Sequence, residues 1–190
     1  MIKQQILDRP TIEGRVKWFV IVNPVAGSGK GLDDYPFISR LLRENSIECE
    51  AVFSEHHCHA TELTVSAIEA GYRHIIVIGG DGTLQETASG IPIGASNVEL
   101  AVIPCGSGND YVRTFGDKDA FLSVADLVEG VAHSVDAIHC GDRISLNIAS
   151  MGMDAAVGQK MQRYKNLPGV SGSMAYNIAV ADVFFHPIGE

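Results

Sequence analysis

The chain is poor in cysteine, in basic residues and in long apolar runs. Four cysteines are scattered through 190 residues without paired spacing, which favours a reduced protein over a disulfide framework. Fourteen Lys and Arg against 23 Asp and Glu give a net charge of −9, whereas a general nucleic-acid binder carries a basic footprint. The sequence shows no signal peptide and no apolar stretch of membrane-spanning length. We therefore expect a cytoplasmic protein that binds no nucleic acid.

What the chain does contain is apolar sequence in short, regularly spaced blocks. Hydrophobic residues make up 46% of it and charged residues 19%, so a packed core is expected. Apolar runs alternate with helical patterns up to about residue 130, which predicts a doubly wound, mostly parallel α/β sheet with helices on both faces. The predicted strands are 18–22, 47–53, 74–78 and 100–104, and the predicted helices are 35–44, 60–70 (capped by His59 or Thr61 and ended by Gly71), 84–89 and 119–129.

The pattern changes after residue 130. Two strands at 134–139 and 143–149 are predicted to form a hairpin, followed by helices at 154–164 and 173–185. We therefore expect a nucleotide-binding domain over 1–130 and the beginning of an incomplete, β-rich second domain over 131–190. Two strands are not a stable sheet by themselves. Either the chain is a fragment, or this part packs on the first domain or on a partner, and the same unpaired edge makes a homodimer conceivable.

Three predicted strands end in glycine-rich loops, at residues 23–29, 79–83 and 106–110. Ligands of open α/β sheets bind at the carboxyl ends of the strands. Glycines there let backbone N–H groups approach phosphates, and the N-terminus of the following helix favours negative charge. A single loop of this kind is usually only a turn. Three of them predict one ligand site for a phosphorylated compound.

Two familiar nucleotide motifs do not fit these loops. A P-loop needs a glycine five residues before its Gly-Lys pair and a hydroxyl residue after it, but Pro24 and Gly31 occupy those positions around 29–30. In the dinucleotide fingerprint Gly-x-Gly-x-x-Gly the third glycine would come one residue later than Gly31. A bound nucleotide must therefore use a different cradle.

A loop that only binds an anion would not be expected to carry a carboxylate, so the presence of Asp81 needs another explanation. A carboxylate beside phosphates either holds a Mg²⁺ ion between them or acts as a base toward a hydroxyl group. Asn109 and Asp110 fit a ligand contact or an Asx-type turn equally well. Lys30 fits either a phosphate contact or a solvated side chain.

The segment 56–59, His-His-Cys-His, carries metal-ligating side chains in a row. We expect no metal site there, because adjacent side chains diverge in direction and the sequence shows no second ligand pair nearby.

The three loops, in this order, resemble the diacylglycerol kinase catalytic-domain family within the wider NAD-kinase-like group. The resemblance runs from about Trp18 to Tyr176. Residues 79–84, Gly-Gly-Asp-Gly-Thr-Leu, are similar to the family signature, and residues 147–155 resemble the opening of its second domain. Gln85 replaces the usual asparagine, Ser107 the usual threonine and Met153 the commoner phenylalanine.

The resemblance implies an ATP-dependent lipid kinase that uses ATP and Mg²⁺ and transfers the γ-phosphoryl group to the hydroxyl of a diacylglycerol-like lipid, with peripheral contact to a membrane. Asp81 would be the catalytic residue and a Mg²⁺ ligand through the nucleotide. Family members are longer, so this chain would carry mainly the nucleotide-binding half. The implied nucleotide-binding residues are Asn23, Pro24, Gly27, Ser28, Gly79, Gly80, Gly82, Thr83, Glu86, Gly106, Ser107, Gly108 and Asn109.

Two alternatives stay open at this point. A kinase of the same group for NAD or another soluble substrate would use the same Gly-Gly-Asp-Gly cradle. A non-catalytic nucleotide-binding or scaffold fragment would also fit the missing second half.

Overall fold

The computed structural model describes residues 17–95, 97–116, 124, 130–141, 143–165 and 167–186. The chain divides into two compact units, Met1–Asn147 and Ile148–Glu190. The division predicted near residue 130 falls beside residues outside the described set and stays a prediction.

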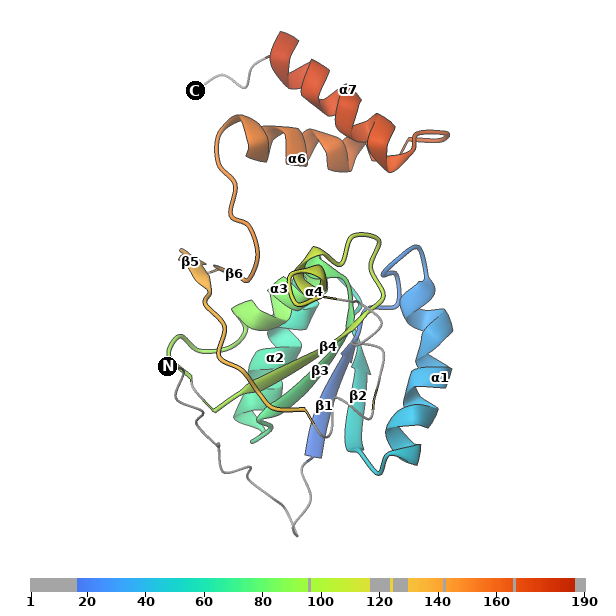
Figure 1. Ribbon diagram of the computed structural model, residues 1–190, viewed down its shortest axis with the longest axis vertical. Coiled ribbons are helices and arrows are strands. Elements are labelled where there is room, and N and C mark those ends of the chain that lie inside the picture. Colours follow the sequence, from blue (N-terminus) through green and yellow to red (C-terminus); the bar gives the residue numbers. More distant parts are fainter. Residues whose placement is uncertain are drawn as a thin grey trace. The chain divides into compact units, whose positions relative to one another are not determined.

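The first unit is built on a parallel four-stranded sheet with the order β2-β1-β3-β4 (Figure 1). The predicted α/β architecture is therefore confirmed. β1 lies between β2 and β3, so the chain adds one strand on one side of β1 and then crosses over to build the other side. The four strands are β1 (Lys17–Val22), β2 (Glu48–Phe53), β3 (His74–Gly79) and β4 (Glu99–Pro104).

Alternate residues of the central strands enter two different cores, as the two-residue period of a strand requires. Val20, Ile76 and Ile78 face helix α1 (Lys30–Glu44), which contributes Ile38 and Leu42. Phe19, Ile21 and Ile75 face helix α2 (His59–Glu69), and Val77 packs against Leu84 of helix α3 (Asp81–Ser89). Figure 1 shows α1 on one side of the sheet and α2 and α3 on the other.

Most predicted helices are found, with differences at their N-termini. α1 begins at Lys30, five residues before the predicted start, and includes Pro36. α2 has Cys58 at its N-cap without a side-chain cap bond, so the expected caps His59 and Thr61 were wrong; Gly71 follows its end at φ +95° as predicted. A short helix, α4 (Asp110–Arg113), follows the third loop. The helix predicted at 119–129 lies outside the described residues except for Val124, which is buried.

The predicted hairpin is present but shorter than expected. β5 (Ile138–Cys140) pairs antiparallel with β6 (Arg143–Ser145), and Gly141 turns between them at φ +61°. Within the first unit the hairpin packs on helix α3: the backbone N–H of Ile144 donates to Ser89 Oγ at 3.1 Å. This contact explains why the compact unit extends beyond the parallel sheet.

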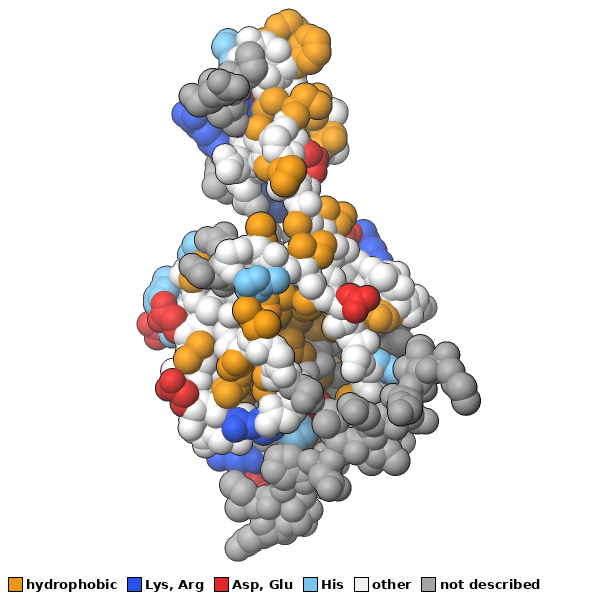
Figure 2. All heavy atoms as spheres, turned by 90° about the vertical axis from the view of Figure 1, so that its left-hand side faces the viewer, with side chains coloured by type: hydrophobic (Ala, Val, Ile, Leu, Met, Phe, Trp, Pro, Cys, Tyr) orange, Lys and Arg blue, Asp and Glu red, His pale blue; other side chains and the backbone are white. Residues whose placement is uncertain are grey.

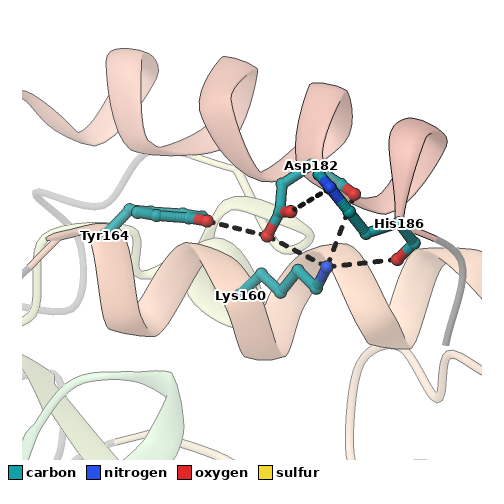
Figure 3. Close-up of polar contacts among 4 residues, drawn as sticks. All are labelled: Lys160, Tyr164, Asp182 and His186. Carbon is teal, nitrogen blue, oxygen red and sulfur yellow. Dashed lines mark hydrogen bonds and ion pairs between the residues drawn. The ribbon is translucent and has the colours of Figure 1, made fainter.

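The second unit consists of helices α6 (Met153–Lys165) and α7 (Gly172–Phe185). Ala156 and Val157 pack against Ala179 and Val183. Asp182 of α7 ties the helices together: its carboxylate accepts from Tyr164 Oη at 2.7 Å and lies 2.9 Å from Lys160 Nζ (Figure 3). The Tyr164 hydrogen bond, with help from Lys160, lowers the pKa of Asp182 to about 2.

Apolar side chains also lie on the outside of this helix pair, as Figure 2 shows. Phe184 and Phe185 are 75% and 74% exposed. Among the described residues, no helix has the length and apolar character needed to cross a bilayer.

Candidate functional site

The three glycine loops meet at the carboxyl end of the sheet, where the strand order reverses. β1 and β3 are neighbours, with Val22 paired to Ile78, and the first two loops leave from these two strand ends. The third loop follows β4, whose Pro104 pairs with Gly79. Such a topological switch point is where doubly wound sheets bind ligands.

Asn23 fastens the first loop to the second. Its backbone N–H donates to the Ile78 carbonyl at 2.9 Å, and its side-chain Nδ2 donates to Thr83 Oγ1 at 2.8 Å. Its Oδ1 accepts from the backbone N–H of Val25 at 3.1 Å, which holds the turn that begins the loop. Both ends of the Asn23 amide are therefore used to shape the site.

Glycines allow the three loops to touch. Gly27 has φ +58°, and a Cβ there would lie 2.2 Å from the carbonyl oxygen of Cys105. A Cβ on Gly106 would lie 2.5 Å from Gly80 Cα. The backbone N–H of Cys105 donates to the Gly79 carbonyl at 2.8 Å. The close approach of these backbones leaves no room for side chains at Gly27 and Gly106.

Asn109 shapes the third loop through its own amide. Oδ1 accepts from the Gly106 N–H at 2.9 Å, and Nδ2 donates to the Gly106 carbonyl at 2.8 Å. Asn109 itself has φ +56°, a conformation that asparagine tolerates better than most residues. These bonds run back to Gly106, so they are neither the Asx-type turn nor a side-chain cap of α4, and a ligand contact of Asn109 stays a prediction.

Asp81 is the first residue of α3, and its Oδ1 accepts a 3.0 Å hydrogen bond from the backbone N–H of Tyr111 in α4. The point where a Cβ of Gly108 would sit lies 3.2 Å from Asp81 Oδ2 and 3.4 Å from Asp110 Oδ2. Two carboxylates therefore lie close to the same point of the third loop. The first turn of α3 adds backbone N–H groups that favour anions.

Most of the other predicted nucleotide-binding residues lie on the three loops. Ser28 and Ser107 are exposed on their loops, and Thr83 is buried beneath them. A Cβ on Gly82 would meet no atom within 4 Å, so open space lies in front of α3. Pro24, Gly79 and Gly108 belong to the same three loops. Lys30 pairs with Asp34 at 3.8 Å.

Glu86 lies elsewhere: its Oε1 is 3.0 Å from Nδ1 of His57. Residues 56–59 thus have a carboxylate neighbour after all, and the reason given for expecting no metal site there was incomplete. The Asp110 carboxylate beside Asp81 and the His57–Glu86 contact were both missed. The proximity of Asp110 to Asp81 depends on the register of β3 and β4, and the His57–Glu86 contact depends on the packing of α2 on α3. The spacing of residues along the sequence could reveal neither contact.

Comparison with known proteins agrees with this geometry. The model of the family described as "Diacylglycerol kinase catalytic domain" matches residues 17–140. A "Probable lipid kinase YegS-like" of Pseudomonas putida is 32% identical over 117 residues, which are 62% of this chain and 39% of that protein. A "Diacylglycerol kinase" of Staphylococcus saprophyticus is 29% identical over 160 residues, which are 84% of this chain and 52% of that protein.

A solved structure shows the same likeness. The crystal structure titled a diacylglycerol kinase from Bacillus anthracis superposes with a TM-score of 0.61 at 26% identity and covers 77% of this chain and 52% of that one. The chain thus spans about half the length of this structure and of the Staphylococcus relative. The matched residues contain all three loops that converge at the switch point, and the chain belongs to the diacylglycerol kinase catalytic-domain family.

Proposed function

We propose that this chain is the nucleotide-binding half of an ATP-dependent lipid kinase that transfers the γ-phosphoryl group of ATP to a lipid hydroxyl. The observation that carries the proposal is the convergence of the three glycine loops, fastened by Asn23 and Thr83, at the switch point of the sheet. Membership of the family and the names of the relatives, lipid kinase and diacylglycerol kinase, support the substrate class.

Phosphoryl transfer asks a protein mainly to position the reactants and to stabilise developing charge. The backbone N–H groups of Gly80 and Gly82 are available at the start of α3 for this purpose, and exposed Ser28 supplies a hydroxyl donor from the first loop. Thr83 accepts from Asn23 of the first loop, and Asn109 is hydrogen-bonded to Gly106 of its own loop, so the role that we assign to both is to hold the loop backbone in place. Ser107 is exposed on the third loop and offers a further hydroxyl group.

The residues around Asp81 fit a Mg²⁺ ion. Magnesium prefers oxygen ligands and is usually held by one or two carboxylates together with substrate phosphates. Oxygen atoms of Asp81 and Asp110 both lie within 3.4 Å of the position that a Cβ of Gly108 would take, next to the proposed phosphate site. A bound Mg²⁺ ion would neutralise phosphate charge there. Asp81 is the residue that we assign to hold it or to accept the proton of the lipid hydroxyl.

Nucleotide binding is the first test, because it needs only this chain. A ligand present at a hundred times its dissociation constant stabilises the folded state by about 2.7 kcal/mol. We expect ATP or ADP with Mg²⁺ to raise the unfolding temperature in a thermal-shift titration. No response to any adenine nucleotide would contradict the proposal.

The variant Gly82→Gln tests whether the nucleotide phosphates bind in front of α3. A Cβ there meets no protein atom within 4 Å, so the fold should persist, while the added side chain extends into the space in front of α3. Unfolding without ligand should stay near the wild-type temperature, and the nucleotide-induced shift should disappear. A preserved shift would place the phosphates elsewhere.

The acceptor is tested separately by phosphate transfer from ATP to diacylglycerol in mixed micelles, with NAD as a parallel soluble acceptor. Transfer to diacylglycerol alone supports a lipid kinase that meets the membrane peripherally. Transfer to NAD alone would instead support the soluble-substrate alternative. Nucleotide binding without transfer to either acceptor is the result expected of a non-catalytic half.

A further inference from the structure

Outside the glycine loops, the described residues contain two clusters in which three metal-ligating atoms lie within 4.8 Å of one another. One consists of His56, His59 and Glu62, and the other of His57, Cys58 and Glu86. We call the second the His57 cluster. The two clusters share the loop that precedes α2, but only the His57 cluster includes a residue of α3.

The geometry of the first cluster opposes a shared metal ion. The rings of His56 and His59 are stacked, with centroids 4.4 Å apart and planes only 12° from parallel. A metal ion lies in the plane of each imidazole that binds it through a nitrogen lone pair, and two stacked rings have no common plane. In addition, His59 Nδ1 accepts a 3.0 Å hydrogen bond from the backbone N–H of Glu55, which fixes the proton of a neutral ring on Nε2.

The His57 cluster meets the requirements that the first cluster fails. His57 Nδ1 lies 3.0 Å from Glu86 Oε1, and Cys58 Sγ lies close to both. The His57 side chain is 82% exposed, so its Nε2 can carry a proton into solvent while Nδ1 binds a metal. Glu86 is 22% exposed and belongs to a helix, so its carboxylate is the firmly positioned member.

The packing of α2 on α3 holds the cluster together. Thr61 Oγ1 donates to the carbonyl oxygen of Glu86 at 2.8 Å. A Cβ on Gly90 would lie 2.6 Å from Thr64 Cβ, so the two helices are in close contact. The distance between the loop at 57–58 and Glu86 is thus set by the fold and not by an exposed ion pair alone.

We propose that His57, Cys58 and Glu86 form a zinc site that connects the loop before α2 to helix α3. One thiolate, one imidazole and one carboxylate are ligands that Zn²⁺ accepts in tetrahedral geometry. With zinc–nitrogen and zinc–oxygen bonds of about 2.0–2.1 Å, the two ligand atoms of a tetrahedral site lie about 3.3 Å apart. The 3.0 Å between His57 and Glu86 needs only a small opening to reach that spacing. Water fills the fourth position.

The test uses the whole 190-residue chain under a non-thiol reductant, titrated with Co²⁺ as a spectroscopic stand-in for Zn²⁺ and then with Zn²⁺ in competition. We expect one equivalent of Co²⁺ to give a thiolate-to-cobalt charge-transfer band that one equivalent of Zn²⁺ abolishes. Zn²⁺ should also raise the unfolding temperature. Absence of the band, or no displacement by Zn²⁺, would overturn the proposal.

Two variants remove ligands without endangering the fold. Cys58 has φ +66°, so Cys58→Gly deletes the thiol at a position where glycine fits the backbone better. His57→Ala alters a side chain that is largely in solvent. Removing a residue that only hydrogen-bonds to a metal ligand already weakens metal binding by about 10–100-fold. Each variant, which removes a ligand itself, should therefore bind Co²⁺ at least tenfold more weakly. Cys58→Gly should also show no charge-transfer band.

Cys140→Ser and His56→Ala are the matched controls, because Cys140 is an exposed thiol on the hairpin and His56 belongs to the first cluster. Both should bind Co²⁺ like the wild-type chain. If His56→Ala removes binding while Cys58→Gly keeps it, the site is the first cluster and the proposal is wrong. If Cys140→Ser removes the band, the metal lies on the hairpin and the proposal is equally wrong.

Discussion

The side-chain amide of Asn23 donates a 2.8 Å hydrogen bond to Thr83 Oγ1, which joins the loop after β1 to the first turn of α3. Thr83 is 5% exposed, so removing Asn23 leaves a buried hydroxyl without this donor. We expect Asn23→Ala and Thr83→Val each to lower the free energy of unfolding by about 1–3 kcal/mol, the cost of an unsatisfied buried group. Urea denaturation measures both.

The double variant shows whether the two residues act through each other. If both single variants are destabilised because they lose the same hydrogen bond, the free energy of unfolding of the double variant should fall by about 1 kcal/mol less than the sum of the two single decreases. Additive losses would mean that the two side chains contribute independently.

Gly27→Ala should destabilise the first loop. Gly27 has φ +58°, and a Cβ would lie 2.2 Å from the Cys105 carbonyl oxygen. We expect a loss of roughly 1–3 kcal/mol of unfolding free energy from the strained backbone alone, with the steric clash added to it. Gly29→Ala is the matched control, because Gly29 also has a positive φ of +101° but open space around its Cβ position. Equal losses in the two variants would show that the contact with Cys105 is unimportant.

Asp81→Asn should separate nucleotide binding from the contribution of Mg²⁺. The amide keeps an oxygen that can accept from the Tyr111 N–H, so the fold should be retained. We expect Mg²⁺ to increase the affinity of the wild-type chain for ATP. In the variant, the factor by which Mg²⁺ increases this affinity should be smaller by at least about tenfold, or 1.4 kcal/mol of binding free energy. Calorimetry with and without Mg²⁺ measures the difference. Glu48→Gln removes a charge at the opposite, amino end of β2 and should leave the gain unchanged. An unaltered gain in Asp81→Asn would remove Asp81 from the metal site.

The helix pair α6–α7 should lose stability at acidic pH. The pKa of Asp182 is lowered from 3.8 to about 2, so the folded state binds this proton less readily than the unfolded state. The contribution of Asp182 is therefore complete above pH 4 and is lost as the pH falls toward 2. An NMR titration of the Asp182 carboxyl carbon should give a midpoint near 2, and Tyr164→Phe should move it upward because the largest contribution to the shift is removed. A midpoint near 3.8 in the wild-type chain would contradict the contact shown in Figure 3.

Much of the sheet could be predicted because its strands carry their own signal. Runs such as residues 18–22 and 75–78 are apolar on both faces, and only strands covered by helices on both sides need that composition. The start of α1 was missed because Gly29, Gly31 and Pro36 are unfavourable in an isolated helix. In the fold Gly31 is required: a Cβ there would lie 2.1 Å from the Asn23 carbonyl oxygen.

The site was predictable in its position but not in its internal contacts. The glycine loops could be assigned to one edge from the strand pattern alone. The sequence could not tell that Asn109 binds its own loop or that Glu86 faces His57, since these depend on turn conformation and on the packing of α2 against α3. Glu86 was placed with the nucleotide loops by resemblance, and this role stays a prediction.

The strand order has a consequence for how the molecule folds. Asn23 and Thr83 are 60 residues apart in sequence, and β2, β3 and two helices lie between them. Contacts of such long sequence separation carry a large loop-closure cost and slow the folding reaction. The candidate nucleotide site forms only after β1 and β3 have paired, so it does not exist while the sheet is still assembling. A bound nucleotide would then leave the folding rate almost unchanged and lengthen the lifetime of the finished sheet.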